Sequence, residues 1–247
     1  KNLVFKETKI SQIIDDFKAS KKINREQSVF LAQSLNEFAM LGNNSPRIKE
    51  LSKKEIKKLN ASNLKSVYNE IITYEKTINF VGNIEIDNLK LMLNKYLKHS
   101  HQLKPKEAYI ILNRQIPKNN KIYILNKKNS IQSHIVFNIE GSKRLNSSLP
   151  ISKAFNSYFG NDMSSLVFQE IRELRSLAYA TFANYELAPK EGKNNRFFAY
   201  IGCQSDKTIE SIKAMNDLIR KMPEKPDRIE MIKSSLILER KKIKELL

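Results

Sequence analysis

Arg172 and Tyr179 are the residues whose types and spacing most strongly suggest chemistry. They lie seven positions apart in the stretch Tyr158–Tyr185, which reads YFGNDMSSLVFQEIRELRSLAYATFANY. Apolar residues recur at helical spacing up to Leu174, and from Leu177 the period changes to two. A helix ending at Arg172 should therefore be followed by a strand beginning at Tyr179. This corner would place a cation beside a phenol, and both groups donate hydrogen bonds.

The elements on either side of this corner must hold the two groups in place. Asn161 and Asp162 supply turn and helix-capping chemistry before the helix. The helical stripe expected to face a core is Met163, Leu166, Val167, Ile171 and Leu174. The residues expected to share one face of the following strand are Tyr179, Thr181, Ala183 and Tyr185.

The same stretch resembles the pitrilysin/insulinase family of zinc metallopeptidases. The residues that carry the resemblance are Phe159, Gly160, Met163, Ser164, Ser165, Leu166, Phe168, Glu170, Arg172, Leu177, Ala178 and Tyr179. Many members have a second glycine after the first. Asn161 stands there in this chain, and we expect it to keep the turn because asparagine tolerates left-handed backbone. Segments beginning at Ile78, Gln132 and Ile201 are similar to further family elements, so the likeness covers roughly residues 25–245.

In this family two halves close like a clamshell around an unfolded peptide. The zinc-binding half does the chemistry, and the other half supplies walls and substrate contacts. The resemblance implies that this chain is a non-catalytic C-terminal-half segment, similar to the long bacterial members. Arg172 would bind a substrate main-chain carbonyl, and Tyr179 would offer its hydroxyl to the scissile carbonyl and its developing oxyanion. Without the resemblance, Arg172 paired with a nearby Glu and Tyr179 as an ordinary strand aromatic would be the simpler interpretation.

The zinc motif of the family, H-x-x-E-H on a helix, is absent from this sequence. Its three histidines are His99, His101 and His134. The first two lie in the polar run KHSHQLK and are expected to be solvated, while His134 lies on an alternating run and is expected on a strand surface. Cys203 is the single cysteine. We therefore predict no metal and no cofactor in this chain, with zinc in the missing catalytic half, and no peptidase activity from the chain alone.

The order of predicted elements indicates an α+β fold, with antiparallel sheets and helices packed on one face. Two partial family units are expected, over 1–101 and 121–247, joined by a linker at 102–120 that holds two prolines. The predicted helices are Glu26–Leu41, Asn63–Ile72, Asp87–Leu97, 150–158, Ile209–Ile219 capped by Asp206, and one from Asp227, with a capping box at Ser52–Glu55. The predicted strands are Ile78–Val81, Lys121–Leu125, Ile131–Ile139, and the antiparallel pair Tyr179–Tyr185 and Phe197–Cys203. One extended segment is expected within the linker, at Ala108–Leu112.

Composition limits the possible partners. The formal net charge is +18, but lysine is scattered over every predicted helix and no nucleic-acid-binding motif is present, so we expect no nucleic-acid partner. No apolar run approaches the roughly 20 residues that span a bilayer, and no transmembrane segment is expected. The expected partners are a catalytic N-terminal half or co-encoded subunit and a peptide substrate. By analogy with the long bacterial members, the expected location is the periplasm or the outer membrane.

A second hypothesis belongs to a different functional class. The chain could be a catalytically inactive adaptor or structural subunit of a processing-peptidase-type complex, which would keep the fold without needing Arg172 and Tyr179. An H-x-x-E-H helix on the same polypeptide or on a co-encoded one would favour the peptidase.

Overall fold

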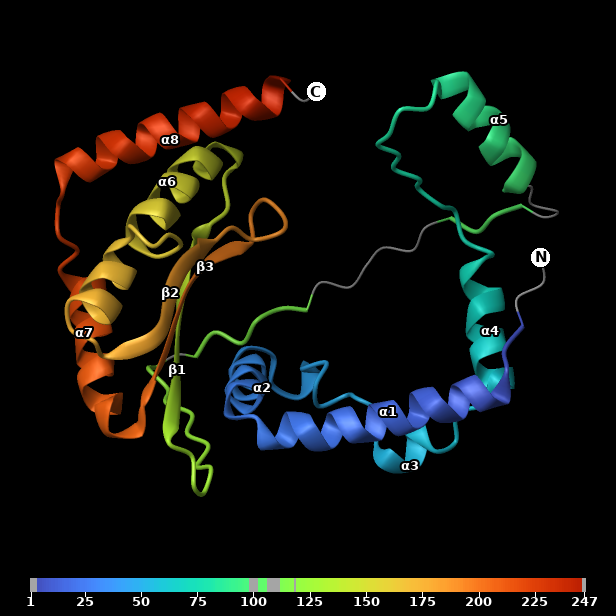
Figure 1. The fold of residues 1–247 in the computed structure, drawn as a ribbon, viewed down its shortest axis with the longest axis horizontal. Coiled ribbons are helices and arrows are strands. Elements are labelled where there is room, and N and C mark those ends of the chain that lie inside the picture. Colours follow the sequence, from blue (N-terminus) through green and yellow to red (C-terminus); the bar gives the residue numbers. More distant parts are fainter. Residues whose placement is uncertain (1–3, 98–101, 106–111, 118, 246–247) are drawn as a thin grey trace. The chain divides into compact units, whose positions relative to one another are not determined.

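The computed structural model describes residues 4–97, 102–105, 112–117 and 119–245 (Figure 1). These residues form two compact units. The first unit is Lys1–Ile23 with Lys49–Asn113, and the second unit is Asn24–Ile48 with Arg114–Leu247. The family-domain boundaries expected at 1–101, 102–120 and 121–247 remain a prediction. The structure adds that the segment Asn24–Ile48 belongs to the second unit.

The first unit consists of helices among its described residues. These are most of α1 (Glu7–Glu26), α3 (Lys53–Ile56), α4 (Ala61–Ile71) and α5 (Ile86–Tyr96). The predicted capping box is confirmed: Ser52 Oγ accepts from the backbone N–H of Glu55, whose carboxylate accepts from the N–H of Ser52 at 2.7 Å. The helix α1 was not predicted.

The strand expected at Ile78–Val81 does not form. These residues are irregular, and Val81 is fully exposed. A short apolar run becomes a strand only where a neighbouring strand completes its backbone hydrogen bonds, and none lies beside it among the described residues. Most of the extended segment expected at Ala108–Leu112 lies outside the described residues, as do His99 and His101.

The second unit is built on a three-stranded antiparallel sheet. Its strands are β1 (Gln132–Lys143), β2 (Ala178–Glu186) and β3 (Asn194–Gln204), in the order β1-β3-β2. The predicted pairing of β2 with β3 is confirmed. The strand expected at Lys121–Leu125 is wrong, because these residues form no ladder and Ile122 is 87% exposed.

Helices cover one face of this sheet and enclose the core. They are α6 (Leu149–Phe159), a π-helix (Phe168–Glu173), α7 (Thr208–Arg220) and α8 (Pro226–Glu245); Figure 1 shows α6 and α7 on the same side of the strands. The largest fully buried apolar side chains are Leu166, Val167, Ile171, Ile201 and Met215. This arrangement confirms the predicted α+β class. Asp206 does not cap α7, because it lies in a 3-10 turn and Lys207 holds the N-cap position without a side-chain bond.

The opposite face of the sheet is here called the outer face. Strand pairing and alternation assign to it His134, Val136 and Asn138 of β1, Ala180, Phe182 and Asn184 of β2, and Phe198, Tyr200 and Gly202 of β3. Helix α2 (Ser28–Leu41) lies against the β1 side of this face. Ser28 Oγ is 2.8 Å from Nε2 of His134, and the amide of Asn138 donates to the side-chain oxygen of Asn36. The outer face over β2 remains half-exposed, with Phe182 42% exposed.

No helix in the described parts of the chain is both long enough and apolar enough to cross a membrane.

Candidate functional site

The helix that carries Arg172 has π geometry, which differs from the predicted α-helix. Residues Phe168–Glu173 are wound with hydrogen bonds five residues apart, such as Leu174 N–H to the carbonyl of Gln169 at 2.9 Å. Single π turns occur often at functional sites. The wider winding rotates Leu174 away from the core, and Leu174 is 71% exposed.

Only part of the expected apolar stripe is buried. Leu166, Val167 and Ile171 are fully buried, whereas Leu174 is rotated out and Met163 is 78% exposed because it lies before the first helical residue. The prediction was therefore correct for the middle of the stripe and wrong at both ends.

A residue with left-handed backbone lies in the turn after the π-helix, whereas the sequence suggested one at Asn161. Ser176 has φ 49°, and the N–H of Leu177 bonds to the carbonyl of Ile171 at 3.0 Å, which closes the helix end. Asn161 does not have positive φ, so the expectation that it supplies left-handed backbone is wrong.

Tyr179 is turned out of the core by a bulge at the start of β2. Ala178 stands opposite Cys203, but Ala180 stands opposite Gly202, so Tyr179 is an extra residue between two paired positions. Such a bulge shifts the side-chain alternation by one and re-aims the residue within it. Tyr179 is 44% exposed, whereas Thr181 and Ala183 are buried. The expectation that Tyr179 shares a face with these residues is therefore wrong.

The phenol ring of Tyr179 lies over Gly202 on the outer face. Burial, and then the neighbouring buried Cys203 thiol, raise the pKa of Tyr179 above its ordinary value. Burial, Tyr179 and Cys203 together raise the pKa of Tyr200 to about 12. Both phenols therefore keep their protons at neutral pH and remain hydrogen-bond donors.

A hydrogen-bonded chain fixes the second phenol beside Tyr179. Nδ1 of His134 is 2.8 Å from the hydroxyl of Tyr200, and Nε2 of the same ring is 2.8 Å from Ser28 Oγ. Burial lowers the pKa of His134, so the ring is neutral near pH 7 and has one donor and one acceptor. His134 lies on a strand as predicted, but it is an internal link between α2, β1 and β3.

Arg172 is half-exposed and only weakly paired. Its Nε is 3.7 Å from Oε1 of Glu173, and both side chains are nearly half exposed, so this pair contributes little. The guanidinium carbon lies 4.8 Å from the centre of the Phe168 ring. Most of its donors are thus available to another molecule.

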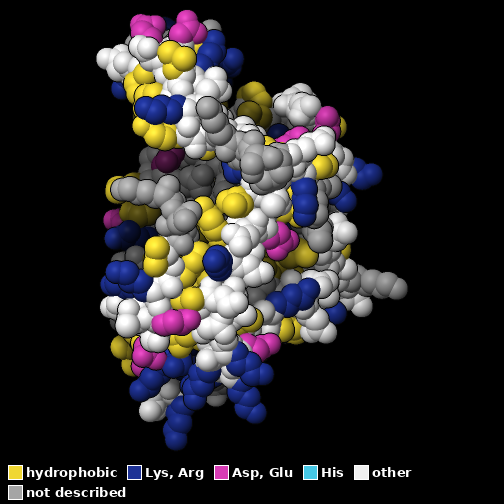
Figure 2. All heavy atoms as spheres, turned by 90° about the vertical axis from the view of Figure 1, so that its right-hand side faces the viewer, with side chains coloured by type: hydrophobic (Ala, Val, Ile, Leu, Met, Phe, Trp, Pro, Cys, Tyr) yellow, Lys and Arg dark blue, Asp and Glu magenta, His cyan; other side chains and the backbone are white. Residues whose placement is uncertain are grey.

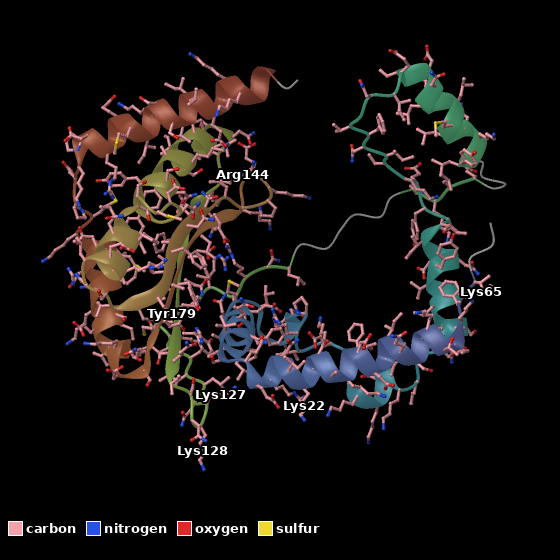
Figure 3. All side chains as sticks on the ribbon, viewed as in Figure 1. Lys22, Lys65, Lys127, Lys128, Arg144 and Tyr179 are labelled. Carbon is pink, nitrogen blue, oxygen red and sulfur yellow. The ribbon has the colours of Figure 1, made fainter. Side chains whose placement is uncertain are left out.

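Arg172 and Tyr179 line one shallow hollow, here called the Arg172 hollow, together with Ser176, Gln204 and Lys207. A second one, the Gln132 hollow, is lined by Ile131, Gln132, Tyr179, Gln204, Ser205 and Asp206. Tyr179 and Gln204 belong to both, so the phenol stands where the two hollows meet. Figure 3 labels Tyr179 on β2 and Arg144 toward the opposite end of the sheet.

Sequence reasoning found Arg172 and Tyr179 but missed Gln204 and Lys207. The available signal was their position, since Gln204 is the last residue of β3 and Lys207 lies three residues beyond it, and this strand was predicted to pair with the strand of Tyr179. Lys207 is bonded to Glu210 at 3.1 Å and is 45% exposed, so it adds a second cation to the rim of the Arg172 hollow.

The described residues do not fit a zinc site. No group of three or more His, Cys, Asp or Glu side chains comes together in the described parts of the chain. Both ring nitrogens of His134 are engaged by hydroxyl groups, and Cys203 is fully buried. We therefore route no chemical step through a metal held by these residues.

Basic side chains are widely distributed. On the face drawn in Figure 2, Lys and Arg side chains are interspersed with acidic and apolar ones. The expected absence of a nucleic-acid partner remains a prediction.

The comparison with known families agrees with the motif. A family model described as the peptidase M16 inactive domain matches residues 58–236, well over half of the chain. The chain therefore belongs to this family, and the resemblance to a pitrilysin-like C-terminal half is confirmed. No curated protein matches the sequence.

Solved structures share the fold at low sequence identity. The peptidase M16 inactive domain from Pseudomonas fluorescens has 14% identity and a TM-score of 0.68, over 95% of this chain and 57% of that one. A conserved protein from Enterococcus faecalis has 18% identity and a TM-score of 0.65, over 98% and 60%. A protease from Helicobacter pylori has 12% identity and a TM-score of 0.66, over 96% and 59%. This chain thus spans about three-fifths of each of these neighbours.

A longer neighbour was solved with a bound protein. The ferredoxin protease FusC, in complex with Arabidopsis ferredoxin, has 13% identity and a TM-score of 0.68, over 94% of this chain and 25% of that one. At these identities the likeness shows the fold alone.

Proposed function

We propose that this chain lines the substrate chamber of a clamshell zinc metallopeptidase, and that Arg172 and Tyr179 contact the peptide near the scissile bond. The observation that carries the proposal is the placement of Tyr179. A bulge removes it from the core, and its half-exposed phenol stands where two hollows meet, one of which Arg172 also lines. The half-exposed phenol is therefore accessible to another molecule at this position.

The chemistry of the two side chains suits different stages of peptide hydrolysis. The hydroxyl of Tyr179, whose pKa is raised by burial, is protonated at neutral pH and can donate to an oxygen that gains negative charge as the peptide is attacked. The planar guanidinium of Arg172 can donate to a backbone carbonyl before the reaction starts. Tyr179 would therefore act mainly on turnover and Arg172 mainly on substrate binding.

The catalytic half would be a separate part of the same polypeptide or a co-encoded subunit. It would hold the zinc that activates the attacking water. The family membership supports this division of labour, and two of the structural neighbours, from Helicobacter pylori and FusC, are proteases. We further propose a periplasmic or outer-membrane-associated location, which cell fractionation with an antibody to the chain would test.

Replacement of Tyr179 by phenylalanine in the complete peptidase tests the proposal. Tyr179→Phe should lower kcat about 100-fold and leave KM nearly unchanged, because it removes a donor to charge that exists in the transition state. Tyr185→Phe is the matched control. Its hydroxyl also lies on β2, but is bonded to Ser142 at 3.2 Å and to Asn195 at 3.3 Å, far from the hollows.

The outcomes separate three interpretations. Loss of kcat in Tyr179→Phe alone, with unchanged thermal melting, supports the proposal. Full turnover would exclude the contact with the oxyanion, and a much lower melting temperature would make Tyr179 a packing residue. An adaptor subunit would show no kinetic effect of either change beyond loss of assembly.

A further inference from the structure

Gly202 occupies the place on the outer face over which the Tyr179 ring lies. A Cβ atom built on Gly202 would be 2.9 Å from Cζ and from Oη of Tyr179, and 3.0 Å from Cε2. Non-bonded carbon atoms are most stable about 3.5–4.0 Å apart. The ring of Tyr179 therefore fills the space that the side chain of any other residue would need.

The backbone at Gly202 does not itself require glycine. The described glycines with positive φ are Gly42 and Gly192, and Gly202 is not among them. Gly202 lies in the central strand and is paired on both sides, with His134 of β1 and Ala180 of β2. Glycine inside a strand weakens it, and often marks a place where another group approaches closely. Here the approaching group is the Tyr179 ring.

The bulge and Gly202 act on the same side chain. With regular pairing, Tyr179 would stand opposite Cys203, on the core face. The extra residue turns it to the outer face, and the missing side chain at Gly202 gives its ring a surface to lie on. The bulge determines the face of the sheet on which the ring lies. The missing side chain at Gly202 allows the ring to approach the sheet closely.

We propose that Gly202 is a positioning residue for Tyr179, and that it holds the phenol hydroxyl at the meeting point of the Arg172 and Gln132 hollows. The catalytic consequence of this role rests on the proposed function, in which that hydroxyl contacts the substrate carbonyl. Gly202 acts only through Tyr179 and touches no substrate. The three atoms nearest to a new methyl group belong to the far end of one side chain, so Gly202→Ala should move the ring and leave the sheet folded.

The chain contains a matched control for this substitution. A Cβ on Gly141, at the far end of β1, would lie 2.7 Å from Oη of Tyr185 and 3.0 Å from its Cε2. Gly141→Ala therefore places the same methyl group against the same kind of ring. Tyr185 pairs with Phe197, six residues along β3 from Cys203, or about 20 Å away along the strand.

Ring displacement can be measured without any enzyme assay. With tyrosine carrying 13C at Cζ, the Tyr179 signal is assigned by its loss in Tyr179→Phe. In Gly202→Ala this signal should shift, and its pH titration should move toward that of an exposed tyrosine. In Gly141→Ala the Tyr179 signal should not change. An unchanged Tyr179 signal in Gly202→Ala would overturn the proposal.

The kinetic arm uses the complete peptidase. Gly202→Ala should lower kcat about 10- to 100-fold with KM nearly unchanged, as expected for a displaced reacting group, and Gly141→Ala should not. In the Tyr179→Phe background, Gly202→Ala should lower kcat no further. A further loss of the same size in that background would show that Gly202 acts by another route. Another outcome is that Tyr179→Phe keeps full turnover while the Tyr179 signal moves in Gly202→Ala. In that case Gly202 still positions Tyr179, and only the proposed contact with the oxyanion is excluded.

A double variant covers the case in which Gly202→Ala fails to fold. Tyr179→Ala removes the ring. The double variant with both Tyr179→Ala and Gly202→Ala should therefore have nearly the same melting temperature as Tyr179→Ala alone. Failure of the double variant to fold would show that the methyl group clashes with something other than the ring, and would overturn the proposal.

Discussion

The backbone N–H of Ala183 donates to the carbonyl oxygen of Gly160 at 3.1 Å, so the end of α6 is bonded directly to the edge strand β2. Asn156 strengthens this contact through its side chain, which accepts from the N–H of Tyr185 at 2.6 Å and donates to its carbonyl at 3.1 Å. A Cβ atom on Gly160 would lie 2.2 Å from the carbonyl oxygen of Ala183. The glycine of this family motif thus has a structural reason, because no side chain fits between α6 and β2 at Gly160.

Gly160→Ala should destabilise the second unit by about 1–3 kcal/mol, the usual cost of an added methyl group in a packed site. The clash is with backbone, so it cannot be relieved by turning a side chain. The exposed neighbour Asn161 is the control, and Asn161→Ala should change stability little. Urea unfolding followed by circular dichroism measures both. Equal stability of Gly160→Ala and the parent chain would mean that α6 can move away from β2 at no cost.

Arg172→Ala should raise KM of the complete peptidase about 10-fold, because a hydrogen bond between a charged donor and a neutral carbonyl is worth about 1.5–3 kcal/mol. Arg172→Lys should recover part of this loss, since it keeps the charge but not the planar fork. Arg175→Ala, in the exposed turn that follows, is the control for a lost positive charge. Equal effects of the two alanine variants would reduce Arg172 to a general electrostatic contribution.

His134 should make the stability of the second unit depend on pH below neutrality. Burial lowers its pKa in the folded chain relative to the unfolded value of about 6.5, so its contribution is present above that pH and is lost as pH falls through the folded value. The difference in melting temperature between the parent chain and His134→Gln should therefore shrink from pH 7.5 to pH 5. A constant difference over this range would show that the ring titrates as it does in the unfolded chain.

The isolated chain should hydrolyse no peptide and bind no stoichiometric zinc. The sequence lacks the family's ligand spacing, and His134 is committed to two hydroxyl groups. Elemental analysis of protein purified without a chelator measures the metal directly. One tightly bound zinc per chain, lost when His99 and His101 are replaced, would contradict this expectation.

Limited proteolysis should cut first within residues 102–120, where periodicity is lost and two prolines occur. The change from the first to the second unit, between Asn113 and Arg114, falls inside this stretch. Because α2 belongs to the N-terminal fragment but packs on β1, the two fragments should elute together until denaturant is added. Early cleavage within Met163–Tyr185 would contradict the prediction.

Sequence reasoning succeeded where local pattern and family motif agreed. The β2–β3 hairpin, the capping box at Ser52 and the end of α2 at Gly42 all rest on interactions between residues close in sequence. The bulge at Tyr179 could not be predicted, because it depends on the register that β3 imposes on β2. Local alternation alone predicted that Tyr179 and Thr181 lie on the same face of the strand.

The failed strands have the same cause. The runs at Ile78–Val81 and Lys121–Leu125 have strand-like sequences but no ladder partner among the described residues. Helix α1 is a different case, because Ile10, Ile13, Ile14 and Phe17 recur at helical spacing in its sequence, ETKISQIIDDFKASKKINRE, and this helix could have been predicted. The outcome of the two apolar runs depended on neighbours that a single sequence does not show.

The bond between Ser28 and His134 joins residues 106 positions apart, and it has a consequence for how the chain matures. During synthesis α2 leaves the ribosome long before β1, and β3, which carries Tyr200, follows later still. Until then the surface of α2 that meets the sheet has no partner and is open to chaperones and proteases. Long-range closure of this kind also slows folding. The second unit should thus be the last part of the chain to become resistant to degradation, although its first helix is among the earliest segments made.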